Sequence, residues 1–76
     1  MGEFYSTTDF YFSAALMALG FTLFGVDRVS SPFKFQFAVD DDRAEELLLE
    51  YINGGMEVPA IEYSRKIKDL KRVIYS

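Results

Sequence analysis

One short alternating stretch, residues 33–39, constrains the fold of this chain most strongly. Large apolar side chains stand at Phe33, Phe35, Phe37 and Val39, with smaller or polar residues between them. Successive side chains of a strand point to opposite faces, whereas a helix would spread these four around its circumference. The stretch therefore predicts a half-buried β-strand with one aromatic face. Because that face needs a cover, we expect helices from the rest of the chain to pack on it.

The segments around this strand carry signals of their own. Residues 22–28 are rich in side chains that suit a pleated surface, and the short connection that follows predicts an antiparallel hairpin with residues 33–39. Apolar residues repeat with helical spacing in three further segments, so we expect helices over residues 9–19, 40–53 and 59–74.

The ends of these helices are also marked. Residues 1–7 are expected to be extended. Ser and Thr at positions 6–8 are the expected N-caps of the first helix that follows, with Asp9 in its first turn. Gly20 is the expected C′ residue at positive φ, and Pro59 the expected first residue of the third helix. The extended residues 56–58 could add a third strand to the sheet.

Length and composition predict a single small domain over residues 1–76. Its fold class is α+β: a small antiparallel hairpin sheet of two or three strands, covered by three helices in the order α-β-β-α-α. Half of the residues are apolar, and eight are phenylalanine and five tyrosine. A chain of this size buries only about 60% of its unfolded surface. We therefore expect some aromatic surface to meet another chain, with a homo-oligomer as one result.

The composition also limits the chemistry. The chain has no cysteine and no histidine, which removes thiolate chemistry and the usual general base. Asp40, Asp41 and Asp42 could bind a divalent cation, but capping of the second helix explains them better. Gly20 and Gly25 have the spacing of a phosphate-binding loop that lacks its lysine. We therefore expect a protein that is not an enzyme and carries no cofactor or metal ion.

The location of the protein can be argued from its charges. Residues 10–26 contain no charged side chain, but this run of 17 is shorter than the ~20 residues that a membrane span needs. The N-terminus has Glu3 and no basic run, which is unlike a secretory signal. We expect a cytoplasmic protein without a membrane partner, and the absence of cysteine fits a reducing compartment.

Charge is divided unevenly along the chain. Residues 1–58 contain three Lys/Arg and ten Asp/Glu, whereas residues 59–76 contain five and two. A helical wheel gathers basic residues on one flank of the third helix, which favours an anionic partner. The alternative is ordinary solvation, or pairing with an acidic outer face of the second helix in this or a neighbouring copy. The basic flank comprises Arg65, Lys68, Lys71 and Arg72, and the acidic face comprises Asp42, Glu46 and Glu50.

The aromatic strand has a second interpretation. Rings at alternate positions of a strand can form a platform on which RNA bases stack. Such platforms lie in solvent beside basic residues, whereas the opposite face of this strand carries only Lys34 and Gln36. A core position for the phenylalanines is the better prediction.

Several short motifs together resemble a known family. They are Tyr5–Tyr11 (YSTTDFY), Leu19–Phe21, Tyr51–Gly54 (YING), Leu70–Lys71 and Ile74–Ser76 (IYS). Their order and spacing over nearly the whole chain are similar to small proteins encoded by tailed phages, prophages and other mobile elements. The family has no agreed activity, so the resemblance assigns no functional residue. It implies a phage or mobile-element origin and an intracellular setting in the host.

These observations lead to two main hypotheses. The first is a non-catalytic interaction protein that binds a macromolecular partner, for example by blocking a nucleic-acid-binding host defence factor with its acidic face. The second is direct binding of nucleic acid through the basic flank. A small molecule bound at an oligomer interface is a third alternative.

Overall fold

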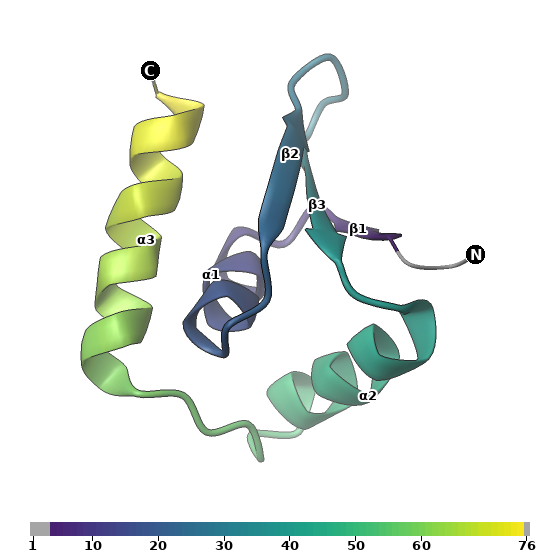
Figure 1. Ribbon diagram of the computed structural model, residues 1–76, viewed down its shortest axis with the longest axis vertical. Coiled ribbons are helices and arrows are strands. Elements are labelled where there is room, and N and C mark those ends of the chain that lie inside the picture. Colours follow the sequence, from purple (N-terminus) through teal and green to yellow (C-terminus); the bar gives the residue numbers. More distant parts are fainter. Residues whose placement is uncertain (1–3, 76) are drawn as a thin grey trace.

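The computed structural model describes residues 4–75, which form an α+β domain (Figure 1). The elements in chain order are β1 (Phe4–Thr7), α1 (Phe10–Ala18), β2 (Leu23–Asp27), β3 (Lys34–Ala38), α2 (Asp41–Ile52) and α3 (Ala60–Ile74). The predicted fold class is confirmed, with one strand added before the first helix. The predicted extended segment at the N-terminus includes residues 1–3, which lie outside the described part of the chain.

The three strands form an antiparallel sheet in the order β1-β3-β2. The predicted hairpin of β2 and β3 is confirmed, but the third strand is β1 and not residues 56–58. The N–H groups of Gly55 and Met56 donate to the carbonyl oxygen of Glu50, so the start of this segment closes α2. The following Pro59 directs the chain into α3. The free edge of β3 is paired instead by β1, where Phe4 lies opposite Ala38.

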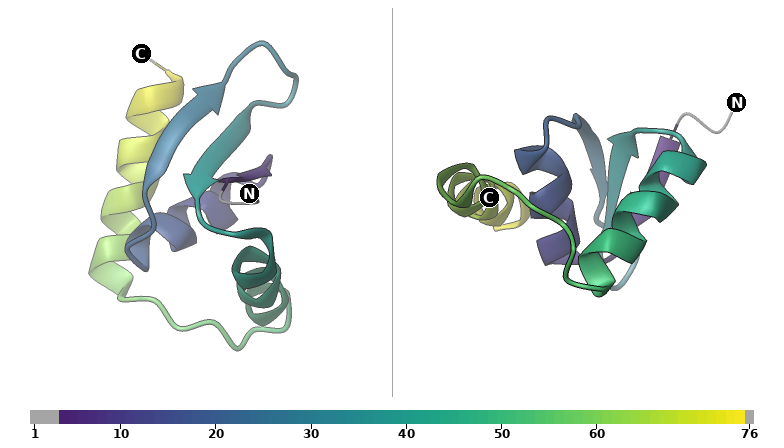
Figure 2. Two further views of the ribbon diagram at one scale, coloured as in Figure 1. Left: turned by 45° about the vertical axis from the view of Figure 1, so that its right-hand side comes forward. Right: turned by 90° about the horizontal axis from the view of Figure 1, so that it is seen from below.

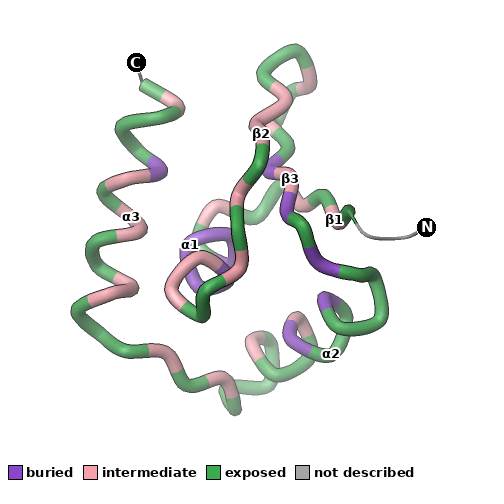
Figure 3. Tube along the Cα trace, in the orientation of Figure 1, coloured by how far each residue is buried: buried purple, intermediate pink, exposed green. Residues whose placement is uncertain are grey.

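The aromatic face of β3 points into the core, as its alternation predicted. Phe35, Phe37 and Val39 are buried, and Phe33 is half-buried. Helices α1, α2 and α3 cover this face with buried residues of their own, which are Phe12, Leu16, Ala44, Leu47 and Leu70. Burying such side chains is the main source of stability in a chain that has no disulfide. Figure 3 shows that buried positions are concentrated where the elements meet.

The helix ends follow the capping rules with two corrections. The N-cap of α1 is Asp9 itself and not a residue of 6–8, since its carboxylate accepts the Phe12 N–H at 2.9 Å. Thr7 instead accepts the N–H of Asp9. Pro59 lies at the N-cap position of α3 and not at its first helical position, because its carbonyl oxygen begins the helix. Gly20 has a φ of 101°, which confirms the predicted end of α1.

The helices are arranged in one layer against the sheet. Figures 1 and 2 show α1 between α2 and α3. Tyr51 of α2 contacts Phe12 of α1 with ring centroids 5.2 Å apart. On the other side, the Tyr63 hydroxyl of α3 donates to the Tyr11 carbonyl oxygen of α1 at 3.4 Å. Within residues 4–75, no helix covers the second face of the sheet, and this open face is where the candidate site lies.

Candidate interaction site

The open face of the sheet is formed by the residues that alternate with the core positions. On β3 these are Lys34, Gln36 and Ala38, and on β1 they are Phe4 and Ser6. Strand β2 adds Phe24. The two phenylalanines are 62% and 49% exposed, although both belong to paired strands. Aromatic side chains are among the residues that folding would bury first, so their position in solvent needs an explanation.

The two exposed rings contact each other. The ring centroids of Phe4 and Phe24 are 4.6 Å apart, with an interplanar angle of 47°. Because β3 lies between β1 and β2, the rings meet over the central strand. Ala38, which is the register partner of Phe4, leaves room for this contact. The result is a small aromatic ridge on the face of the sheet that no helix of residues 4–75 covers.

A β-bulge in β2 determines which residues of this strand point to the core and which to the open face. Leu23 pairs with Phe37 and Val26 with Phe35, so two residues of β2 stand opposite Gln36. The extra residue keeps both Leu23 and Val26 on the core side while Phe24 points to the open face. A Cβ at Gly25 would lie 2.7 Å from the Gln36 Oε1 atom, so a larger residue here would displace the flexible end of that side chain.

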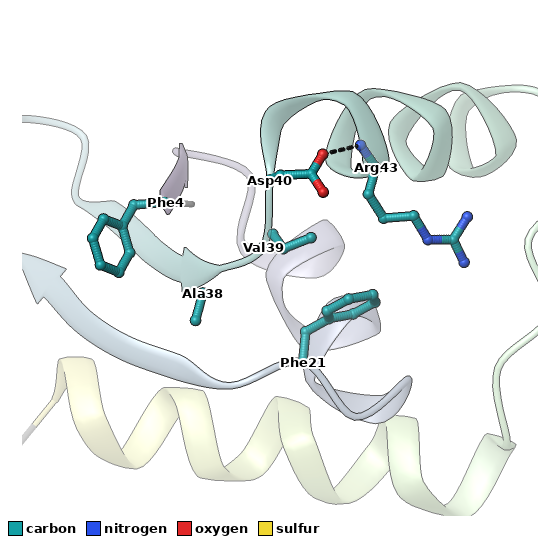
Figure 4. A pocket seen from close by; sticks show the side chains of 6 residues that line it. All are labelled: Phe4, Phe21, Ala38, Val39, Asp40 and Arg43. Carbon is teal, nitrogen blue, oxygen red and sulfur yellow. Dashed lines mark hydrogen bonds between the residues drawn. The ribbon is translucent and has the colours of Figure 1, made fainter. Parts of the chain in front are cut away.

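A shallow hollow of about 420 Å³ continues the ridge toward α2 (Figure 4). Its apolar lining comes from Phe4, Phe21, Ala38 and Val39, and Asp40 and Arg43 stand at its rim. Asp40 is the N-cap of α2 and accepts the backbone N–H of Arg43 at 2.9 Å. The Arg43 guanidinium lies 3.3 Å from Glu46 Oε1 on the exposed side of the helix. The hollow could receive an apolar side chain beside a polar rim.

The predicted basic flank lies on the exposed side of α3. Arg65, Lys68, Lys71 and Arg72 are all exposed, and Arg65 Nη1 lies 3.8 Å from Glu62 Oε2. Lys71 also borders a hollow of about 310 Å³ whose other residues are Phe10, Tyr11, Ile74 and Tyr75. The four cations are therefore accessible, and Lys71 borders the same hollow as two tyrosines.

The predicted acidic face is likewise exposed, on the outside of α2. Asp42 and Glu50 lie in solvent, and Glu46 is paired with Arg43. Asp41 and Asp42 occupy the first turn, where carboxylates interact favourably with the helix dipole. Over residues 4–75, no group of three or more acidic, His or Cys side chains is arranged to hold a metal ion.

The titratable groups with shifted pKa values line neither the aromatic ridge nor the hollow beside it. Asp27, the last residue of β2, has its pKa lowered by the hydrogen bond from the Ser30 hydroxyl and by the N–H groups of Val29 and Ser30. Burial raises the pKa values of Tyr51 and Tyr63, and nearby Asp9 adds to both shifts. These shifts follow from local packing and hydrogen bonding, so they do not indicate a catalytic group.

Sequence reasoning missed the aromatic ridge. The exposed phenylalanines are separated by 19 intervening residues, and only the pairing of β1 with β3 brings their rings together. The sequence of β2 contained one indication, because Phe24 follows the core residue Leu23 directly and should therefore point to the opposite face of the sheet. The bulge hid this indication, because strict alternation along β2 would place Val26 on the same face as Phe24.

The chain has no match among known proteins in the comparisons. No family model matches the chain, and searches of curated proteins and of solved structures found no match either. Among the described residues, none of the helices is both long and apolar enough for a membrane span. The function must therefore be inferred from the surfaces of this chain.

Proposed function

We propose that this chain is a non-catalytic interaction protein that binds a protein partner through the open face of its sheet. The contact between the exposed Phe4 and Phe24 rings is the observation that carries the proposal. Aromatic residues are enriched in the buried centres of protein interfaces, where they often supply much of the binding energy. A partner that covers the ridge would remove this apolar surface from water.

The chemistry of the face favours a protein over a nucleic acid. Lys34 is a cation on the open face, but Asp27 lies opposite Lys34 in the sheet register and lowers the net charge of this face. A surface for a nucleic-acid backbone would need a more positive potential. The hollow next to the ridge suits an aliphatic or aromatic anchor residue of a partner protein, with Arg43 and Asp40 available for polar contacts at the rim.

The biological setting is proposed from the family resemblance. A chain of phage or mobile-element origin would act in the cytoplasm of its host, where a host defence factor is one kind of partner. The acidic face of Asp42, Glu46 and Glu50 could then present carboxylates in place of nucleic acid. Exposed apolar residues also favour association of this protein with itself.

The proposal is tested by affinity capture from host cells with a matched pair of variants. Phe24→Arg places a charge in the aromatic ridge, so it should abolish capture of the partner. Val29→Arg introduces the same charge at an almost fully exposed position of the hairpin connection and should leave capture unchanged. Thermal unfolding of both variants checks that the fold is kept.

A captured protein is then purified and titrated against both variants. Binding that is at least tenfold weaker for Phe24→Arg alone supports the open face as the site. Equal binding by both variants would contradict it, as would the failure of the unchanged protein to capture any partner.

A second candidate function is the binding of nucleic acid by the basic flank. The hollow that Lys71 shares with Tyr11 and Tyr75 favours it, because a cation and aromatic rings that border one hollow can contact a phosphate and stack on a base. Replacing Arg65, Lys68, Lys71 and Arg72 by Gln should then abolish retention on single-stranded DNA or RNA. Retention by the unchanged protein should fall steeply with salt. A lack of retention at low salt would remove this candidate.

A further inference from the structure

The outer surface of α2 carries a stripe that has an acidic half and an apolar half. Its members follow the helical spacing i, i+3, i+7 and i+10, and all are exposed. Leu49 and Ile52, at the C-terminal end, are 56% and 67% exposed. We name this the α2 stripe, and it consists of Asp42, Glu45, Leu49 and Ile52.

The outer surface of α3 carries a second stripe with the opposite character. It follows the spacing i, i+4, i+7 and i+11, with an apolar residue at the N-terminal end and cations beyond it. Ile61 is 70% exposed, although the N-terminal end of a solvated helix surface would ordinarily be polar. We name this the α3 stripe, and it consists of Ile61, Arg65, Lys68 and Arg72.

The two stripes are complementary when the helices run antiparallel. Asp42 then meets Arg72, Glu45 meets Lys68, and Ile52 meets Ile61 at the far end. Between them Leu49 would lie against the aliphatic part of the Arg65 side chain. The stripes also match in length, at about 15 Å and 16.5 Å for a rise of 1.5 Å per residue. Over residues 4–75, no ion pair within the chain involves Asp42, Glu45, Lys68 or Arg72, whereas Arg65 pairs weakly with Glu62.

The stripes of one molecule cannot meet each other. Helix α1 lies between α2 and α3, and each of them faces α1 through a tyrosine, Tyr51 or Tyr63 (Figures 1 and 2). The stripes lie on the sides of the helices away from α1, so they point outward from opposite flanks of the molecule. A complementary surface is therefore offered to another molecule.

We infer that the α2 stripe of one copy binds the α3 stripe of a second copy, in an antiparallel helix pair that joins copies head to tail. Opposite charges at one end and apolar contact at the other fix the register of the pair. Since the two stripes differ, the contact is heterologous, and it can continue from copy to copy. This deepens the proposed self-association and does not involve the open face of the sheet.

The inference is tested by sedimentation velocity over a range of protein concentrations, with charge reversal in two variants. The first variant, Asp42→Lys with Glu45→Lys, has two basic stripes. The second, Lys68→Glu with Arg72→Glu, has two acidic ones. Each alone should associate at least about tenfold more weakly than the unchanged protein, since two attractive pairs become repulsive. An equimolar mixture of the two should associate again, because each supplies the stripe that the other now needs.

Two further measurements keep the test decisive. Asp42 lies in the first turn of α2, and its substitution could disturb that turn. The single variants Glu45→Lys and Lys68→Glu avoid this, and they are tested separately and as an equimolar mixture. The control Glu50→Lys with Glu57→Lys makes the same charge change as the first variant at exposed positions outside the stripe, and should associate normally.

The outcomes separate this inference from the proposed function. Phe24→Arg should leave association of copies unchanged. Glu45→Lys alone, which changes neither the open face nor the acidic face, should still capture the partner of the open face. The inference would be overturned by an unchanged protein that stays monomeric at high concentration and low salt. A mixture that associates no better than its separate components would overturn it as well.

Discussion

Asp27 shows how one side chain orders the hairpin connection. Its carboxylate accepts hydrogen bonds from the Ser30 hydroxyl and from the N–H groups of Val29 and Ser30, which lowers its pKa below the ordinary value of 3.8. These bonds form a turn of the kind in which Asp replaces a backbone acceptor. They hold together a connection that is longer than a two-residue hairpin loop.

A pH dependence of stability follows from this shift. A lowered folded-state pKa gives stability that is present above the unfolded value and is lost as the pH falls through the folded value. The free energy of unfolding of the unchanged protein should therefore exceed that of Asp27→Asn at neutral pH, and the difference should shrink below pH 3.8. Urea unfolding of both proteins at neutral and acidic pH measures this. A difference that stays constant with pH would contradict the assignment.

Phenylalanine contributes differently to stability on the two faces of the sheet. Phe37 is fully buried, whereas Phe24 contacts Phe4 on the open face and is half exposed. Phe37→Ala should cost about 3–5 kcal/mol, a large part of the 5–15 kcal/mol that stabilises a typical domain. Phe24→Ala should cost about 1 kcal/mol, close to the value of an exposed aromatic contact. Chemical denaturation of the two variants compares these costs, and equal losses would show that the ridge is part of the core.

The elements differ in how far the sequence predicts them. Strand β3 and helices α2 and α3 were predictable because burial of one face imposes a repeat of two or 3.6 on their apolar residues. In α1 the consecutive residues 12–16 are all buried, so its apolar repeat is weaker. Strand β1 was recognised as extended, but its four residues carry too little pattern to show that it pairs with β3. That pairing joins residues about thirty positions apart, and local propensity has no information about it.

Capping was predicted in part for a similar reason. Several residues before α1 can cap a helix, and the choice among them depends on where the chain leaves β1. Pairing of Thr7 with Phe35 keeps residue 7 in the sheet, so the helix begins later and Asp9 becomes the cap. At α2 the three consecutive aspartates were predicted to cap the helix, and Asp40 is the one at the N-cap.

The acidic and basic parts of the chain lie on different flanks of the folded molecule. The sequence showed an acidic first part and a basic end, and it placed the charged residues correctly on the outside of α2 and α3. It could not show that α1 separates these helices and directs their outer surfaces to opposite flanks (Figure 2). The proposed pairing between copies depends on that arrangement.

Association of copies should also alter thermal stability. A contact made by the folded state alone stabilises it by mass action, so the melting temperature should rise with protein concentration. The rise should be smaller in high salt, where the charged halves of the stripes are screened. Scanning calorimetry at several concentrations provides the measurement, with the variant Lys68→Glu and Arg72→Glu as the reference. A melting temperature that is independent of concentration in both proteins would argue against the contact.

The bulge in β2 has a consequence for how this sheet behaves in a crowded solution. An edge strand with regular spacing is a template on which strands of other molecules can add, and an aromatic-rich chain is especially exposed to that hazard. With Phe24 and Gly25 both opposite Gln36, the outer edge of β2 lacks an even ladder of donors and acceptors. Uncontrolled growth of the sheet, as in fibril formation, is thereby discouraged at this edge.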